Sequence, residues 1–340
     1  MKLNMKAFTT LGDGIDALEL KELPAQEPKA GEILVRMTAA SLNYRDLLVV
    51  KGVDRWKPPE PRIPVSDGVG EVVRVGENVS RWKAGDRVVS HLLPRWLDGE
   101  LTAEKGGGPL GGSAADGVLA EYVVLKEEAA LKVPHNLSDV EAATLPIAAL
   151  TAWHAIVRRA LVRSGESVVI QGTGGVSLFA TQFAHALGAR PVVTSSSDEK
   201  LEKARALGAV ATINYRKFPA WEDAVLDLTG GVGADHVIEV VGGENLNRSL
   251  KAVKVSGTIS FIGVLAGLAA PINTYQFMTK NVRLHGIETG SREMFEEMNH
   301  FIETRQLKPV VDRTFAFSEA REALKYLESG AHFGKVAVKF

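Results

Sequence analysis

The eleven residues Ser167–Ser177 read SVVIQGTGGVS, and this stretch decides the fold. Its first five residues form an apolar, β-branched run typical of a buried strand, and an apolar segment that predicts a helix continues to Leu187. Between them, Gly172 permits a tight turn, and Gly174 lets backbone N–H groups approach a pyrophosphate at the helix N-terminus. The stretch therefore predicts a dinucleotide-binding turn, with an ordinary strand–helix turn as the alternative.

The residues of this turn are the first candidates for contact with a cofactor. They are Gly172, Thr173, Gly174, Gly175 and Val176. The next position, where a third glycine usually lets helix and strand pack closely, is Ser177, whose side chain is nearly as small.

Beyond residue 164, short apolar runs alternate with helical segments. The runs predicted as strands are Ser167–Gln171, Pro191–Ser195, Ala211–Asn214, His236–Val241, Thr258–Val264 and Val282–Ile287. This alternation is typical of a parallel sheet covered on both faces, and six such strands complete a doubly wound dinucleotide fold. The remaining segments are expected to form helices at Ser291–Thr304 and Ser318–Ser329, a strand near Thr314–Phe317 and a last strand at Lys335–Phe340.

The first 130 residues differ, because they predict strands and turns dense in glycine and proline. Apolar and polar residues alternate with period two in Gly31–Met37, Gly68–Val75 and Gly85–Val89. The stretch Leu92–Asp116 contains GGGPLGG, which cannot lie inside a helix or strand. It predicts a long loop, either a mobile surface insertion or a lid over a pocket. A helix is expected to begin after the N-cap Ser138.

The composition excludes several classes of function. The 40 basic residues nearly balance the 41 acidic ones, giving a net charge of −1, so no footprint for nucleic acid or an anionic membrane surface is present. No apolar run reaches the roughly 18 residues of a membrane helix. No signal-peptide core follows Met1, which predicts a cytoplasmic protein. The chain has no cysteine, which excludes disulfides, thiolate nucleophiles and Cys-ligated zinc.

The end of the second predicted strand distinguishes the two nicotinamide cofactors. An acidic residue there would bind the ribose 2′-hydroxyl of NAD, whereas its absence beside a basic residue suits the 2′-phosphate of NADP. Here the strand ends in Ser195, Ser196 and Ser197, and Lys200 offers positive charge, with a solvated helix lysine as the alternative. Asp198 is expected to be the N-cap of the next helix. The sequence therefore favours NADPH over NADH.

Motifs spread over the whole chain are similar to those of one family. They are SLNYRD (41–46), DGVGEVV (67–73), VGENV (75–79), AGDRV (84–88), GVLAEY (117–122), TAW (151–153) and the Gly172 turn. Together they resemble the medium-chain dehydrogenase/reductase superfamily. The resemblance implies an α/β protein with a Rossmann doubly wound parallel sheet over residues 145–287. It also implies a discontinuous GroES-like β-barrel catalytic domain over residues 1–144 and 288–340.

The resemblance bears on zinc. In zinc alcohol dehydrogenases of this superfamily, a cysteine ligand stands at the position of Asn43, a His–Glu pair at Ser66 and Asp67, and the remaining ligand near Ile147. Serine and isoleucine are not credible zinc ligands. The lobe that holds four zinc-binding cysteines in those enzymes corresponds to Leu92–Asp116, which has none. The sequence therefore predicts no metal.

Without zinc, hydride transfer to a conjugated carbonyl needs hydrogen-bond donors for the oxygen that gains charge. The resemblance implies this role for Asn43, which matches an asparagine of zinc-free quinone oxidoreductases, with a loop cap as the alternative. Asp46 matches a family aspartate near the nicotinamide, and Tyr44 could donate a proton. Leu48 stands where quinone oxidoreductases carry a tyrosine, and the Asn-Tyr-Arg-Asp string is more similar to enoyl reductase domains of fatty-acid and polyketide synthases.

The same resemblance implies further cofactor contacts. Thr151 matches a threonine beside the nicotinamide, and Tyr215 matches a tyrosine that joins the lysine at the 2′-phosphate. Lys335 matches a basic residue that reaches the pyrophosphate, with a surface lysine as the alternative. The strand-end residues expected to flank the adenosine ribose and the nicotinamide are Val241, Gly242, Ile262, Gly263 and Val264.

The favoured function is an NADPH-dependent, zinc-free oxidoreductase that transfers hydride to a quinone or an α,β-unsaturated carbonyl. Two alternatives remain open at this point: a zinc-independent alcohol dehydrogenase or carbonyl reductase, and a protein that binds NADPH without turnover. A small carbonyl or quinone substrate is expected, with no nucleic-acid or membrane partner. The resemblance also implies a homodimer that pairs through Val282–Ile287.

Overall fold

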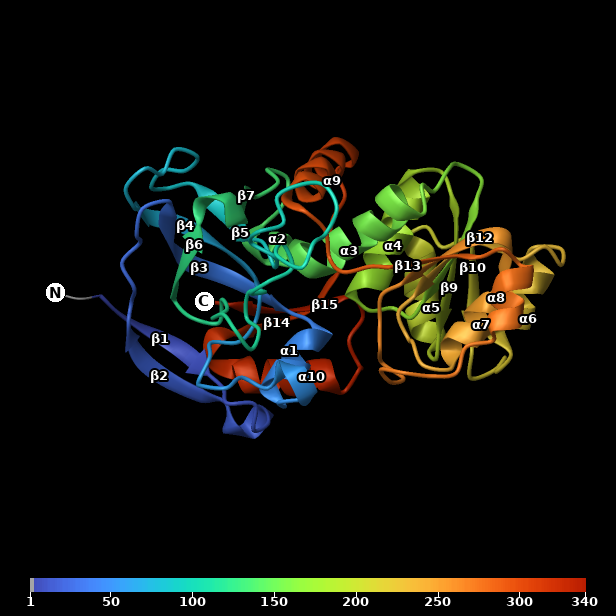
Figure 1. Ribbon diagram of the computed structural model, residues 1–340, viewed down its shortest axis with the longest axis horizontal. Coiled ribbons are helices and arrows are strands. Elements are labelled where there is room, and N and C mark those ends of the chain that lie inside the picture. Colours follow the sequence, from blue (N-terminus) through green and yellow to red (C-terminus); the bar gives the residue numbers. More distant parts are fainter. Residues whose placement is uncertain (1–2) are drawn as a thin grey trace. The chain divides into compact units, whose positions relative to one another are not determined.

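The computed structural model describes residues 3–340, and the chain divides into two compact units. One unit comprises Met1–Leu150 together with Thr289–Phe340, and the other comprises Thr151–Glu288. The sequence placed these boundaries after residues 144 and 287. The first of these two units is called the catalytic unit below, and the second is called the nucleotide unit (Figure 1).

The nucleotide unit is built on a six-stranded parallel sheet with the order β10-β9-β8-β11-β12-β13. Its strands are β8 (Ser167–Gln171), β9 (Arg190–Ser195), β10 (Ala211–Asn214), β11 (Ala234–Glu239), β12 (Val253–Phe261) and β13 (Arg283–Gly286). The order reverses between β8 and β11, so the predicted Rossmann doubly wound sheet is confirmed. Apolar side chains such as Val169, Val237 and Ile259 are buried because helices cover both faces.

Helices connect these strands. They are α4 (Gly175–Ala186), α5 (Asp198–Ala206), α6 (Trp221–Leu228), α7 (Asn245–Ala252) and α8 (Thr274–Thr279). The first two lie against β8, β9 and β10, whereas α7 packs on β11 and β12 and also contacts α6 and α8. A helical segment from Leu145 to Arg159 contains α3 (Leu150–Trp153) between two π-helical turns.

Three strands of this sheet end earlier than the sequence predicted, and β13 does so by a single residue, at Gly286 rather than Ile287. The strand expected at His236–Val241 ends at Glu239, and the strand expected at Thr258–Val264 ends at Phe261. The two segments that follow β11 and β12 pass very close to each other. A Cβ atom built on Gly263 would lie only 1.7 Å from the carbonyl oxygen of Val240. The residues after these strands are therefore loops at the carboxyl edge of the sheet.

The catalytic unit is built on a mixed sheet with the order β14-β15-β3-β4-β5-β7, with β6 also paired to β3. Its strands are β3 (Glu32–Leu42), β4 (Asp67–Val75), β5 (Arg87–Ser90), β6 (Tyr122–Lys126), β7 (Ala130–Lys132), β14 (Val311–Ala316) and β15 (Lys335–Lys339). A separate antiparallel pair joins β1 (Asn4–Thr9) to β2 (Glu19–Pro24). The helices are α1 (Tyr44–Val50), α2 (Asp139–Ala142), α9 (Arg292–Arg305) and α10 (Ala320–Glu328). In Figure 1, the C-terminal β15 lies beside β3 from the N-terminal part.

The long loop predicted at Leu92–Asp116 contains no helix or strand, but it is anchored rather than loose. Trp96 and Leu110 are buried, and Leu110 belongs to the core of the catalytic unit. The carbonyl oxygens of Trp96 and Leu97 accept hydrogen bonds from the first backbone amides of α9. Within residues 3–340, no helix has the length and apolar character needed to cross a membrane.

Candidate functional site

The glycine-rich turn between β8 and α4 is shaped for an anion. Gly172 has φ 75°, a conformation that glycine adopts without strain, and Gly174 is the N-cap residue of α4. A Cβ atom built on Gly174 would meet no atom within 4 Å, so its outer side is open to a ligand. No side chain caps α4 and no acidic residue lies in its first turn. The residues therefore fit a dinucleotide whose pyrophosphate lies at this helix N-terminus.

The hydroxyl of Ser177, which stands in place of the third glycine, bonds to the protein backbone. This hydroxyl donates a hydrogen bond to the carbonyl oxygen of Gln171 at 2.7 Å and is buried. The serine therefore ties the first turn of α4 to the end of β8, and close packing is kept without glycine.

The end of β9 offers hydroxyls and no acid. Ser195 is buried, and Ser197 is the N-cap of α5, because its Oγ accepts a hydrogen bond from the backbone of Lys200. The expectation that Asp198 is the N-cap was wrong. Ser197 occupies the cap position, and the carboxylate of Asp198 accepts from Nδ2 of Asn214 at 2.6 Å and pairs with Lys217 at 2.5 Å.

The other side chains predicted to contact the 2′-phosphate, and Thr151, predicted beside the nicotinamide, differ in their exposure. Tyr215 follows β10 with its backbone N–H bonded to the carbonyl of Ser195, and its side chain is 41% exposed. Ser196 and Lys200 are half-buried. Thr151 is buried in α3.

A buried carboxylate organises the loops that follow β11 and β12. Glu239 Oε1 accepts from the backbone amides of Val241 at 2.8 Å and Gly242 at 2.9 Å. Asn245, Gln171 and Ser249 also donate to this carboxylate.

The same turn brings the predicted strand-end residues together. A Cβ atom on Gly242 would lie 2.5 Å from the carbonyl oxygen of Gly263, so both glycines are required there. The backbone amides of Ile262 and Gly263 bond to the carbonyl oxygen of Glu239, and Val264 lies against Gly242. The candidate residues of these two loops therefore form one surface at the carboxyl edge of the sheet.

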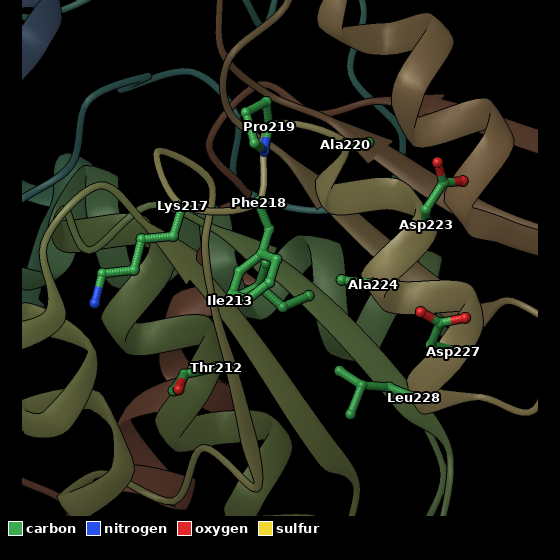
Figure 2. A pocket seen from close by; sticks show the side chains of 10 residues that line it. All are labelled: Thr212, Ile213, Lys217, Phe218, Pro219, Ala220, Asp223, Ala224, Asp227 and Leu228. Atoms are coloured by element: carbon green, nitrogen blue, oxygen red, sulfur yellow. The ribbon is translucent and has the colours of Figure 1, made fainter.

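The nucleotide unit also has a hollow of about 580 Å³, which lies away from the predicted cofactor residues. It is bordered by β10, the loop after it and α6 (Figure 2). Figure 2 shows Phe218 beside Ile213 at its centre and the carboxyls of Asp223 and Asp227 on the helix. None of the predicted site residues lines it, and Phe218 is 61% exposed, so this is an open surface depression.

In the catalytic unit, Asn43 lies at the junction of β3 and α1. It is the N-cap residue of α1, but its side chain faces other partners. Nδ2 donates to Oδ2 of Asp67 at 2.8 Å, and Oδ1 accepts from the Nζ of Lys335 at 2.6 Å. The side chain is nearly buried, with 8% of the residue exposed.

The partners of Asn43 come from distant parts of the chain. Asp67 begins β4, and its Oδ2 also accepts from the backbone N–H of Ile147 at 3.1 Å. Ile147 lies in the first π-helical turn, where early amides lack a partner in their own helix. Lys335 begins β15 and reaches Asn43 because Val336 pairs with Leu42 across the sheet. It is 3% exposed, so the alternative of a surface lysine is wrong.

Asp46 lies in the first turn of α1, next to the backbone of Asn43. Its Oδ2 accepts from the backbone N–H of Asn43 at 2.8 Å, whereas Oδ1 has no hydrogen-bond partner. Complete burial raises the pKa of Asp46 to about 7, although the Arg45 guanidinium, 3.9 Å away, opposes the shift. Tyr44 is 45% exposed.

Burial also shifts the other two ionisable groups around Asn43. The pKa of Asp67 is raised by loss of solvent, and the charge of Lys335 opposes this shift. The pKa of Lys335 is lowered by burial and held up by the carboxylates of Asp67 and Asp46. With Asp46 protonated, Asp67 and Lys335 form a neutral buried set.

These residues do not fit a zinc ion. Zinc sites use cysteine, histidine or carboxylate ligands, and among Asn43, Ser66, Asp67 and Ile147 only Asp67 carries a carboxylate, which already accepts three hydrogen bonds. The amide nitrogen of Asn43 is directed at that carboxylate, and an ammonium group contacts the amide oxygen. Across residues 3–340, no cluster of three or more histidine or acidic side chains could hold a metal.

Sequence reasoning missed two organising carboxylates. Asp67 was considered only as a lost metal position, and Glu239 was taken as part of a strand. The signal for Glu239 was an acid inside an apolar run, His236–Val241, because such an acid needs several donors when it is buried.

Comparison with known proteins matches both units. Residues 29–135 match a family model described as an alcohol dehydrogenase GroES-like domain. Residues 175–304 match one described as a zinc-binding dehydrogenase. The mixed sheet of the catalytic unit therefore agrees with the GroES-like barrel that the sequence predicted.

Individual relatives span nearly the whole chain. A zinc-type alcohol dehydrogenase-like protein of Schizosaccharomyces pombe is 44% identical and covers 96% of each chain. An NADPH-dependent alkenal/one oxidoreductase of Arabidopsis thaliana is 31% identical over 96% of this chain and 76% of its own. The crystal structure of a candidate alcohol dehydrogenase from Sinorhizobium meliloti is 43% identical, with a TM-score of 0.93 and complete coverage of both chains.

The order of domains, the glycine turn at the switch point of the sheet and these matches agree. The chain is an oxidoreductase that belongs to the medium-chain dehydrogenase/reductase superfamily.

Proposed function

We propose that this protein is an NADPH-dependent, zinc-free reductase of α,β-unsaturated carbonyls or quinones. The observation that carries the proposal is the fixed amide of Asn43, held by Asp67 and Lys335. The resemblance to zinc alcohol dehydrogenases implies that a zinc ligand stands at this position in those enzymes. A hydrogen-bond donor in a buried setting suits a reaction in which charge develops on an oxygen.

When bound, NADPH would supply a hydride to the β-carbon of an enone, and the C=C π electrons would move towards the carbonyl oxygen. The oxygen becomes an enolate, and a proton added at the α-carbon completes the saturated carbonyl. Asn43 would donate through Nδ2 to that oxygen, and Asp46 would hold the backbone of Asn43 in place. Tyr44, whose phenol is exposed on the first turn of α1, would be the proton donor.

A simple ketone is a poorer substrate for such a site. Its reduction places the whole charge on one alkoxide oxygen, and the metal-dependent enzymes use a Lewis acid for that purpose. Conjugation spreads the charge in an enone or a quinone, so one or two hydrogen bonds suffice.

We further propose that NADPH is bound by the predicted residues of the nucleotide unit. Its pyrophosphate would lie on Gly172, Thr173, Gly174, Gly175 and Val176. Its 2′-phosphate would contact Ser195, Ser196, Ser197, Lys200 and Tyr215. The commitment of Asp198 to Lys217 and Asn214 supports this choice, because it leaves no acid at the end of β9 to bind a free 2′-hydroxyl. The remaining contacts would come from Thr151, Val241, Gly242, Ile262, Gly263 and Val264.

Steady-state oxidation of NADPH tests the function. We expect turnover with 2-alkenals, cyclic enones or quinones, and at least about 100-fold lower kcat/KM with the matching saturated ketones, as loss of charge delocalisation predicts. The experiment is run after exhaustive chelation and again with added Zn²⁺, and both preparations should behave alike.

Other outcomes would select the alternatives. Turnover confined to saturated ketones or alcohols would support a zinc-independent alcohol dehydrogenase. Tight NADPH binding without turnover across the whole panel would support a binding protein. Activity that disappears on chelation would overturn the zinc-free proposal.

We propose a homodimer that pairs through the outer edge of β13. This strand ends the sheet on one side, and Leu284 within it is 36% exposed. Light scattering after gel filtration should give a mass of two chains, and Leu284→Lys should shift it towards one.

A further inference from the structure

The amide of Asn43 can face its two partners in only one orientation. The ammonium of Lys335 carries only donors, so the Asn43 atom that it contacts must be the oxygen. The carboxylate of Asp67 only accepts, so the atom that it contacts must be the nitrogen. The two ends of an asparagine amide are otherwise hard to tell apart, and here the chemistry of the neighbours fixes them.

This arrangement leaves one hydrogen of Asn43 for a substrate. Nδ2 carries two hydrogens, and within residues 3–340 it donates to Asp67 alone. The side chain is not completely enclosed, since 8% of Asn43 is exposed. In the proposed reaction, the second hydrogen would bond to the substrate oxygen.

We propose that Lys335 is a positioning residue for hydride transfer, which holds the Asn43 amide and supplies through it the positive charge that steadies the substrate oxyanion. This inference rests on the proposed function. The ammonium lies 2.6 Å from the amide oxygen, and it draws electron density from the N–H at the other end of the amide. Because the group is 3% exposed, little solvent screens its charge.

The burial of Lys335 supports a dedicated role. An ammonium without compensation is costly to bury, and Lys335 is compensated by the carbonyl oxygen of Leu42 at 2.6 Å and by the charge of Asp67. Lys339 lies four residues later in the same strand, and it is exposed. Lys335 is therefore buried because of the partners at the end of β3, the carbonyl oxygen of Leu42 and the amide oxygen of Asn43, and not merely because it lies in β15.

The competing role for Lys335 is a contact with the pyrophosphate of the cofactor, and the two roles differ in their kinetics. A pyrophosphate ligand would mainly change NADPH affinity. A residue that acts through Asn43 would mainly change kcat, and its effect would vanish once Asn43 is removed.

A double-mutant cycle tests this difference. Lys335→Met should lower kcat about 10- to 100-fold, somewhat less than loss of a direct oxyanion donor, and should change the Kd for NADPH less than about 3-fold. In an Asn43→Ala background the same substitution should change kcat less than about 3-fold. Lys335→Arg should restore part of kcat, and Lys339→Met is the matched control with unchanged kinetics. A Kd that rises as much as kcat falls, or equal effects in both backgrounds, would overturn the proposal.

A second measurement needs no turnover. p-Nitrophenol, whose phenolate oxygen resembles an enolate oxygen, is titrated into the complex with NADP⁺ and its ionisation is followed by absorbance. Wild type should lower the pKa of the bound phenol by about one unit more than Lys335→Met does, a tenfold difference in the ionisation constant. Equal ionisation in both proteins, or no binding to wild type, would count against Lys335. Failure of the proposed function would show itself separately, as no NADPH oxidation by wild type with any enone or quinone.

Discussion

The Oδ2 atom of Asp67 accepts a hydrogen bond from Nδ2 of Asn43 at 2.8 Å, and the same oxygen also binds the backbone N–H of Ile147. Asp67 therefore joins β4, the end of β3 and the helical turn at Leu145–Ala149 around one buried charge.

Replacement of Asp67 should damage both stability and turnover. Asp67→Asn presents an NH₂ group to donors and leaves Lys335 without its neutralising charge, so we expect a loss of about 2–4 kcal/mol in the free energy of unfolding. The kcat for enones should fall about 10- to 100-fold because the Asn43 amide is released. Urea unfolding and steady-state kinetics measure the two effects. Glu71→Gln, on the same strand but half-exposed, should stay within about 0.5 kcal/mol.

The pKa of Asp46 predicts how stability depends on pH. Burial raises this pKa from 3.8 to about 7, so between those values the folded state keeps a proton that the unfolded state loses. The contribution of protonated Asp46 is complete below about pH 4 and declines as the pH rises to about 7, by on the order of 4 kcal/mol.

Asp46→Asn removes that titration while keeping an acceptor for the backbone of Asn43. Unfolding in urea at pH 5 and pH 8 should show wild type losing stability relative to the variant as the pH rises. Parallel stability curves for the two proteins would contradict the raised pKa.

Gly172 and Gly174 of the turn should respond differently to alanine. Gly172→Ala should cost about 1–2 kcal/mol of stability, because φ is 75° there. Gly174→Ala should change stability by less than about 1 kcal/mol, since φ is −79° and its Cβ meets no protein atom.

The same Cβ on residue 174 would fill the space proposed for the pyrophosphate, so the Kd for NADPH should rise at least about tenfold. Thermal unfolding and fluorescence titration separate the two properties. Unchanged NADPH affinity in Gly174→Ala would place the cofactor elsewhere.

Lys200 should decide between the two cofactors. Lys200→Ala removes positive charge beside the proposed 2′-phosphate, so the Kd for NADPH should rise about tenfold while that for NADH changes less than about 3-fold. Lys203→Ala, one turn further along α5, is the matched control, because Lys203 pairs with Glu199. Equal losses for both cofactors in Lys200→Ala would refute the assignment.

Local patterns made the nucleotide unit predictable. The apolar runs for β8 and β10 matched the structure residue for residue, because period, length and glycine punctuation are properties of neighbouring residues. The ends of β11 and β12 were missed for a physical reason. Those strands stop where Glu239 gathers backbone amides and where Gly242 approaches Gly263, contacts that no local window contains.

The candidate site also contains some residues that local sequence predicted and others that only distant contacts bring together. The sequence by itself predicted the glycine turn and the hydroxyl-rich end of β9, and the family resemblance implied that Asn43 stands in place of a metal-binding cysteine. Only the tertiary structure decided what surrounds Asn43. Lys335 is 292 residues away and arrives because β15 pairs with β3, and Asp67 arrives because β4 pairs with the other edge of β3. Burial then shifts the charges of these groups, and burial is a property of the packed sheet rather than of any stretch of sequence.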